Sequence, residues 1–175
     1  KFKEAQDLEM GKNYLASAEQ YQAFAAQNPK SELVSMAMFN AGVNFERSGK
    51  NMQAIDNYRK VLASNDKNAL NLKPKAKKLL AKLYQDAGLF EESALLFKQL
   101  VAENPKDPLV PSYLFNAAAM FEATGKVKEA VQNYTEFIQV NKSTKENRDT
   151  LFTIAELLRK ANANRAALER YKEYV

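Results

Sequence analysis

The sequence predicts an all-α protein of ten helices, arranged as five helix–turn–helix repeats. In each repeat a small residue is followed seven positions later by a turn residue, and nine positions further on by an aromatic ring. Successive repeats start 37, 39, 37 and 37 residues apart, and a fixed period of this size indicates stacked supersecondary units. No segment alternates between apolar and polar residues as a half-buried strand would. The five sets are Ala5, Lys12 and Tyr21; Gly42, Gly49 and Tyr58; Ala81, Gly88 and Phe97; Ala118, Gly125 and Tyr134; and Ala155, Asn162 and Tyr171.

The helix boundaries follow from the residues that break helices. Pro74 and Pro108 are expected in first helical turns, where the N–H that proline lacks would have had no partner. Gly49, Gly88 and Gly125 suit the left-handed residue that ends a helix. The predicted helices pair as 1–11 with 14–27, 31–47 with 51–64, 74–87 with 90–103, 108–123 with 127–141, and 145–160 with 163–175.

The repeated residues are those of a core. In the first helix, the small residue lets the second helix approach closely, and a larger apolar residue three positions later fills the space beside it. The second helix offers a small residue five positions after the turn and the ring four positions later, on the same helix face. We therefore assign the five rings to the core and not to a binding site.

The composition excludes most catalytic and metal chemistry. The chain has no cysteine and no histidine, so it lacks thiolate nucleophiles, the usual general base near neutral pH and the commonest zinc ligand. We expect no enzyme activity, no metal site, no cofactor and no small-molecule substrate. No apolar run approaches the roughly 18 residues of a membrane span.

This repeat pattern resembles that of the tetratricopeptide repeat family. The marks of the family are a small residue and an aromatic residue on the first helix, a turn glycine, and then Ala, an aromatic residue and often Pro on the second. The marks are fullest in 49–58 and 125–134; the closing Pro appears as Pro29 and Pro105, and is replaced by Asp66 and Lys142 in the second and fourth repeats. The resemblance implies one right-handed α-α superhelix over 1–175, with repeats at about 1–29, 30–66, 69–105, 108–142 and 145–175.

The repeats are longer than is usual in the family. Their period exceeds the usual one of about 34 residues, and the surplus is predicted to lie between repeats, with two further residues before the third. Such lengthened repeats are similar to those of bacterial cell-envelope assembly and motility proteins, which favours a periplasmic or cell-envelope location over a cytoplasmic one. Because Lys1 falls inside a first helix and Val175 inside a second, we expect that the chain is part of a longer protein or that its end docks on a partner.

The resemblance also implies a partner-binding groove, because the first helices of tetratricopeptide arrays line a concave surface. The residues that face it lie 13, 10, 6 and 3 positions before each turn residue, and they include Ser112 and Asp149. Phe39, Phe115 and Phe152 recur at one offset as candidate apolar anchors; alternatively, they pack against the neighbouring repeat. The predicted partner-binding residues are Phe39, Val43, Lys75, Lys78, Lys82, Phe115, Glu122 and Phe152.

Lysines mark the third repeat. Residues 67–82 contain six lysines and no acidic residue, in a chain whose net charge is +5. Cations in a first helical turn oppose the helix macrodipole at a cost of about 0.3–1 kcal/mol each. A cluster placed there and aimed at the groove indicates an acidic partner; the alternative is a solvated lysine face.

Some members of the family clamp the C-terminal carboxylate of a partner with Lys, Asn and Arg side chains from three repeats. Asn40 and Asn116 match the Asn positions, and Lys75 matches one of the lysines. The remaining clamp positions hold Phe2, Gln6 and Leu79 in one register, and Asp149 and Thr153 in the other. The clamp is incomplete, so we predict no binding of chaperone tails.

Three functions follow from these observations. The first is a non-catalytic scaffold that binds a helical or extended partner segment in the groove, within a bacterial multiprotein assembly of envelope or motility type. The second is nucleic-acid binding, suggested by a pI of about 9.2 and opposed by the confinement of the basic cluster to one segment without interleaved exposed aromatic residues. The third is a non-catalytic arm of a larger enzyme.

Overall fold

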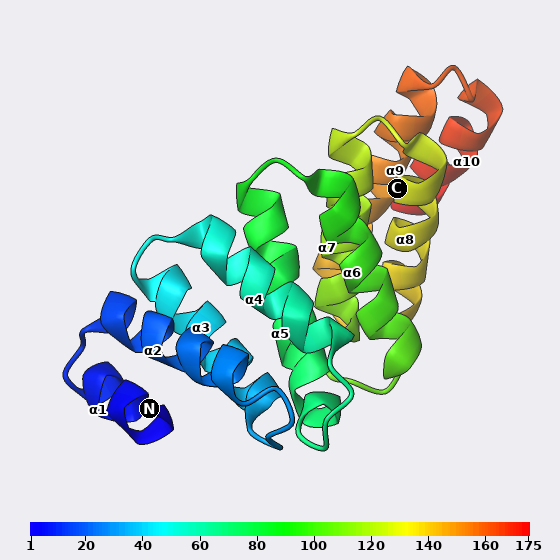
Figure 1. The fold of residues 1–175 in the computed structure, drawn as a ribbon. Helices are drawn as coiled ribbons and strands as arrows, with labels where there is room; N and C mark the ends of the chain where they lie inside the picture. The colour runs from blue at the N-terminus through cyan, green and yellow to red at the C-terminus, as the bar shows by residue number, and fades with distance from the viewer. The chain divides into compact units, whose positions relative to one another are not determined.

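The computed structural model describes all 175 residues, and it contains ten α-helices and no strand (Figure 1). The predicted fold class is confirmed. No helix is both long enough and apolar enough to cross a membrane. The helices are α1 (Phe2–Met10), α2 (Tyr14–Gln27), α3 (Val34–Arg47), α4 (Asn51–Ala63), α5 (Ala69–Asp86), α6 (Phe90–Glu103), α7 (Val110–Ala123), α8 (Val127–Val140), α9 (Thr144–Lys160) and α10 (Asn164–Tyr174).

The chain divides into two compact units, Lys1–Leu83 and Tyr84–Val175, with the boundary inside α5. In the first unit α1 packs on α2, α2 on α3, and α3 on α4. In the second unit α6 packs on α7, α7 on α8, α8 on α9, and α9 on α10. Within each unit a helix therefore packs on its neighbours in sequence, which is how repeat proteins build their cores.

In each repeat, one residue of the turn between the two helices has a left-handed backbone conformation. Gly49, Gly88 and Gly125 have φ angles of +75°, +75° and +72°, as predicted for residues that end helices. Lys12 and Asn162 occupy the same position in the first and fifth repeats, with φ of +60° and +61°. Asn tolerates this conformation, whereas Lys adopts it at a cost of about 1–2 kcal/mol.

The small residues and the rings form the core, as predicted. The small first-helix residues are all buried, and the rings of Tyr21 and Tyr58 are fully buried. At Gly42 an added Cβ would lie 2.6 Å from Cε1 of Tyr58, so this ring lies directly on the backbone of α3. The ring of Tyr171, in the fifth repeat, is only half-buried.

The start of α5 differs from the prediction. The helix begins at Ala69, and Pro74 lies inside it rather than in its first turn. The two additional residues before the third repeat therefore extend a helix instead of a linker. Pro74 cannot donate to the carbonyl of Leu70, which removes one intrahelical hydrogen bond. In α7 the proline of the first turn is Pro111 and not Pro108.

Asp66 explains why a helix can begin at Ala69. Its Oδ1 accepts hydrogen bonds from the backbone N–H groups of Asn68 and Ala69, at 3.0 and 3.1 Å. Its carboxylate also accepts from the backbone N–H of Ser35 at 2.9 Å, from the Ser35 hydroxyl at 2.6 Å and from the Ser64 hydroxyl at 2.9 Å. Asp66 thus caps the N-termini of α3 and α5 together.

These hydrogen bonds determine the ionisation of Asp66. Partial burial opposes the charged form, but the hydrogen bonds from Ser35, Ser64 and Asn68 outweigh it, and the pKa of Asp66 is lowered. The carboxylate is therefore ionised at neutral pH while it holds the two helix starts.

Candidate partner-binding surface

The three phenylalanines of the predicted row share one packing contact but differ in exposure. Phe39 lies 5.8 Å from the ring of Tyr58 and is half-buried. Phe115 lies 5.4 Å from Tyr134, edge to face, and is 42% exposed. Phe152 lies 6.0 Å from Tyr171 and is 45% exposed. Each Phe packs on the second-helix ring of its own repeat, and those of the fourth and fifth repeats also present a face to solvent.

Sequence reasoning missed a fourth member of this row. Phe2 lies ten positions before the turn residue Lys12, the same offset as in the other repeats. Its ring contacts Tyr21 and Phe24 edge to face, both at 5.2 Å. The offset alone would have identified Phe2.

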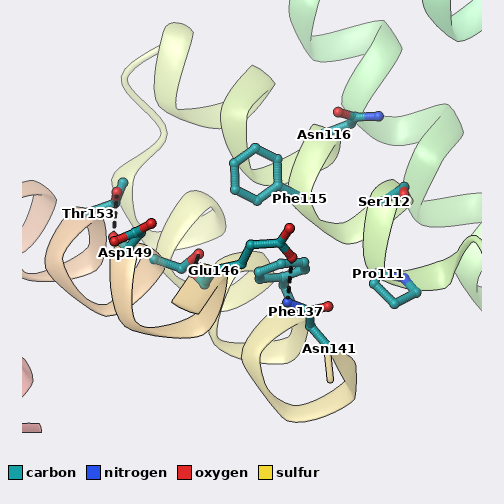
Figure 2. Close-up of a pocket in the computed structure, with 10 residues that line it drawn as sticks. Pro111, Ser112, Phe115, Asn116, Phe137, Asn141, Glu146, Asp149 and Thr153 are labelled. Atoms are coloured by element: carbon teal, nitrogen blue, oxygen red, sulfur yellow. Dashed lines mark hydrogen bonds between the residues drawn. The ribbon is translucent and has the colours of Figure 1, made fainter. Parts of the chain in front are cut away.

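The second unit contains a hollow of about 520 Å³ between α7, the C-terminal end of α8 and α9. Figure 2 shows Phe115 in this hollow, with Asp149 and Thr153 on one side and Ser112 and Asn116 on the other. The prediction identified Ser112, Phe115 and Asp149 as groove residues, and the structure brings them together. The other lining residues are Pro111, Phe137, Asn141, Glu146 and Thr150, which the prediction did not include.

The floor of the hollow is rigid and apolar. Phe115 contacts both Tyr134 and Phe137, with ring centroids 5.4 and 5.3 Å apart. Phe137 is itself buried in a cluster with Val110 and Leu114. The exposed face of Phe115 is therefore held in place by rings that belong to the core.

The rim of the hollow is polar and negatively charged. Nδ2 of Asn141 donates to Oε2 of Glu146 at 3.0 Å. The hydroxyl of Thr153 donates to the backbone carbonyl of Asp149 at 3.2 Å, and the carboxylate of Asp149 accepts no hydrogen bond. Two carboxylates and no lysine or arginine line the hollow, so its fixed charge is negative.

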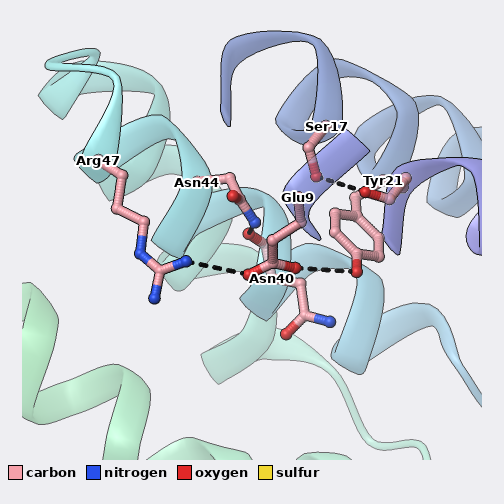
Figure 3. Close-up of polar contacts among 7 residues, drawn as sticks. Glu9, Ser17, Tyr21, Asn40, Asn44 and Arg47 are labelled. Atoms are coloured by element: carbon pink, nitrogen blue, oxygen red, sulfur yellow. Dashed lines mark hydrogen bonds and ion pairs between the residues drawn. The ribbon is translucent and has the colours of Figure 1, made fainter. Parts of the chain in front are cut away.

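In four of the five repeats, a carboxylate on the first helix accepts a hydrogen bond from the tyrosine hydroxyl on the second. Tyr21 donates to Glu9 at 3.2 Å, Tyr58 to Glu46 at 3.2 Å, Tyr134 to Glu122 at 2.9 Å, and Tyr171 to Glu156. Figure 3 shows the carboxylate of Glu9 between the Tyr21 hydroxyl and Arg47. Glu122, a predicted partner-binding residue, is thus also a hydrogen-bond acceptor within its own repeat.

The pKa values of these tyrosines are consistent with hydroxyls that donate hydrogen bonds to the glutamates. Burial, and next the charge of Glu9, raise the pKa of Tyr21 to about 12. Burial is also the main cause of the raised pKa of Tyr58 and Tyr134, with Glu46 and Glu122 adding to it. The hydroxyls therefore stay protonated at neutral pH. In the fifth repeat, hydrogen bonds from Arg159 and then Tyr171 lower the pKa of Glu156 to about 2.

The third repeat lacks the tyrosine–glutamate pair and also the phenylalanine of the other repeats. Gln85 and Phe97 stand where other repeats have Glu and Tyr, and Lys78 stands at the offset of the phenylalanines. The three predicted lysines Lys75, Lys78 and Lys82 are exposed, and none of them forms an ion pair. They lie in the first unit, and the hollow with Phe115 lies in the second.

The remaining predicted residue, Val43, lies in the first unit. It is half-buried and lines a smaller hollow of about 320 Å³ with Glu46, Arg47 and Leu79. This hollow has no exposed aromatic ring. Of the eight predicted partner-binding residues, Phe115 is the one that is both exposed and part of the lining of a hollow.

Comparisons with known proteins agree with the repeat pattern. Two family models, both described as tetratricopeptide repeat, match residues 36–68 and 78–142, which together are more than half of the chain. No curated protein matches the chain in sequence.

Several solved structures share the fold. A chain with nearly identical TPR-like repeats from Podosopora anserina, assigned to kinesin light chain, is 18% identical with a TM-score of 0.60, and the match covers 99% of this chain and 90% of that one. A tetratricopeptide repeat protein from Parabacteroides merdae is 19% identical with a TM-score of 0.63, over 98% and 70% of the two chains. MamA from Desulfovibrio magneticus is 9% identical with a TM-score of 0.60, over 97% and 88%. At these identities the likeness shows the fold alone.

The spacing of small residue, turn and ring, the ten paired helices and the two family matches lead to one conclusion. The chain belongs to the tetratricopeptide repeat family.

Proposed function

We propose that this protein is a non-catalytic scaffold that holds a segment of another protein against the exposed faces of its first helices. The observation that carries the proposal is the exposure of Phe115 and Phe152. Both rings are fixed on one side by packing on a tyrosine and are open to solvent on the other. Exposed aromatic rings in register, held rigidly, are suited to bind a partner at low entropic cost.

The lysine face of α5 supports a contribution from charge. Lys75, Lys78 and Lys82 are exposed on one helix, and none of them forms an ion pair within the protein. Unpaired lysines on one helix face would attract an acidic stretch of the partner and speed its association. This contribution should weaken as salt is added, because exposed charges are screened.

The lengthened repeats support a place for this scaffold in a bacterial multiprotein assembly of the envelope or of motility, with a periplasmic or cell-envelope location. Fractionation of the native cells tests the location. Recovery of the protein in the periplasmic or envelope fraction is expected, and recovery in the cytoplasm alone would overturn it.

Site-specific photo-crosslinking tests the scaffold function. A photoreactive amino acid replaces the exposed residue Ser112 on α7 in one variant, and the exposed residue Gln99 on α6 in another. In the native cells, the variant at position 112 should crosslink to a defined protein, and Phe115→Ala should abolish the crosslink.

Leu95→Ala is the matched control for Phe115→Ala. Leu95 is 48% exposed, but it lies on the second helix α6. Its substitution should leave the crosslink intact. Equal crosslinking from position 99, or a crosslink that survives Phe115→Ala, would contradict the proposed function.

A further inference from the structure

We propose that the hollow of the second unit selects partner segments in which an apolar side chain lies next to a lysine or arginine. This inference rests on the proposed function and adds the chemistry of the partner. The apolar side chain would sit on Phe115, and the cation would reach the carboxylates of Asp149 and Glu146.

The seat for the apolar side chain is already formed. Phe115 is 42% exposed, and its ring is held by Tyr134 and Phe137 at 5.4 and 5.3 Å. Because these two rings are buried, Phe115 loses little conformational freedom when a partner side chain covers it. A preorganised aromatic surface of this kind favours a Leu, Met or aromatic residue of a partner.

The rim supplies negative charge that the protein itself does not neutralise. Asp149 is exposed and accepts no hydrogen bond, and the hydroxyl of Thr153 donates to its backbone carbonyl instead. The carboxylate of Glu146 accepts a hydrogen bond from Asn141 on Oε2 only, so Oε1 can still accept one. No lysine or arginine lines the hollow. A guanidinium or ammonium group of a partner can therefore form a charge-assisted hydrogen bond here.

The same charges exclude the opposite kind of partner. An acidic segment, or the C-terminal carboxylate of a protein, would meet two carboxylates and no cation, and like charges at an interface are unfavourable. The hollow thus differs in preference from the lysine face of α5, which favours acidic residues. The two surfaces would bind different parts of a partner or different partners.

A displayed library of random twelve-residue peptides tests the inference on the full chain. The library is selected against the wild-type protein, and bound peptides are sorted by whether Phe115→Ala abolishes their binding. Peptides that depend on Phe115 should contain an apolar residue with Lys or Arg within three positions, more often than the unselected library does.

Charge variants then test the role of the rim with one selected peptide. Asp149→Lys should weaken its binding about tenfold or more, because a favourable contact becomes a repulsive one. Asp56→Lys on α4 makes the same change in net charge at an exposed position that pairs with Lys60, and it should change binding less than about twofold. The affinity should also fall as salt rises.

The outcomes separate the inference from the function on which it rests. If the Phe115-dependent peptides lack a basic residue, or if Asp149→Lys leaves their binding unchanged, the inference is wrong while the scaffold function stands. If every selected peptide is acidic and depends on Lys78, and none depends on Phe115, the inference alone is likewise overturned. If no peptide depends on Phe115 or on Lys78, both the inference and the peptide-binding groove are wrong. Thermal unfolding of each variant excludes loss of fold as the cause.

Discussion

Asp66 in the first unit and Asp149 in the second are aspartates with opposite environments. Asp66 accepts five hydrogen bonds, from two groups of Ser35 and from Ser64, Asn68 and Ala69. Asp149 lies on the rim of a hollow, is exposed, and accepts none. The first carboxylate has its hydrogen-bonding capacity filled from within the fold, and the second has it available.

Glu122 is intermediate between these two carboxylates. It is half-buried and accepts one hydrogen bond, from Tyr134. The number of internal donors therefore separates carboxylates that stabilise this fold from those that can bind a partner. We therefore expect substitutions to reduce stability most at Asp66, less at the Glu122 pair and least at Asp149, and unfolding measurements on variants test this order.

The largest effect is expected for Asp66→Ala. The substitution leaves the backbone N–H groups of Ser35 and Asn68 without their acceptor, and we expect a loss of about 2–3 kcal/mol of unfolding free energy. Urea unfolding followed by circular dichroism measures the loss. Asp56→Ala, an exposed aspartate on α4, is the control and should cost less than about 0.5 kcal/mol. A loss below about 1 kcal/mol for Asp66→Ala would contradict its role as a shared cap.

The contribution of Asp66 should also appear in the pH dependence of stability. The pKa of Asp66 is lower in the folded protein than in the unfolded chain, where it is about 3.9. Its stabilising contribution is therefore fully present above that value and is lost as the pH falls through the lower, folded value. The difference in Tm between the wild type and Asp66→Asn should be constant from about pH 7 to 5 and should narrow below about pH 4. A difference that persists or widens at about pH 3 would show that the charge of Asp66 is not the cause.

A smaller effect is expected for Tyr134→Phe. The change removes the one donor to Glu122 and leaves a carboxylate that water can still reach, so the expected loss is about 0.5–1 kcal/mol. A double-mutant cycle with Glu122→Gln separates the pair from its surroundings. A coupling energy near zero would show that the hydrogen bond contributes nothing to stability.

The smallest effect is expected for Asp149→Ala. With no donor to lose, this variant should unfold within about 0.5 kcal/mol of the wild type. The same variant should bind the selected peptide more weakly. A stability loss equal to that of Asp66→Ala would place Asp149 among the structural residues and would end the contrast between the two aspartates.

The fold could be predicted from the sequence because its signals are local and repeat five times. The start of α5 could not, because the preference of proline for a first helical turn is only one of the forces that place a helix start. What decided the start was Asp66, and two of its five hydrogen bonds come from Ser35, which is far away in the sequence. A cap shared by two helices has no local signature.

The sequence predicted part of the lining of the hollow in the second unit and not its shape. The offset from the turn identified Phe115, Asp149 and Glu122 as groove residues, and by the same reasoning it could have identified Phe2. It could not distinguish Phe39 from Phe115, because exposure depends on what the neighbouring helix presents. Beside Phe115, α9 presents Asp149 and Thr153, whose short polar side chains leave the hollow open.

The pairs of tyrosine and glutamate have a consequence for how repeats of this kind can be exchanged. In the third repeat the hydroxyl and the carboxylate are both absent, as Phe97 and Gln85. In the fifth repeat Arg159 takes the usual place of the glutamate, and Glu156, one turn earlier, accepts from Tyr171 instead. A repeat that kept the tyrosine without its carboxylate would leave a largely buried phenol unsatisfied. The two helices of a repeat therefore form one module, and a recombinant array should fold best when its crossovers fall between repeats rather than inside them.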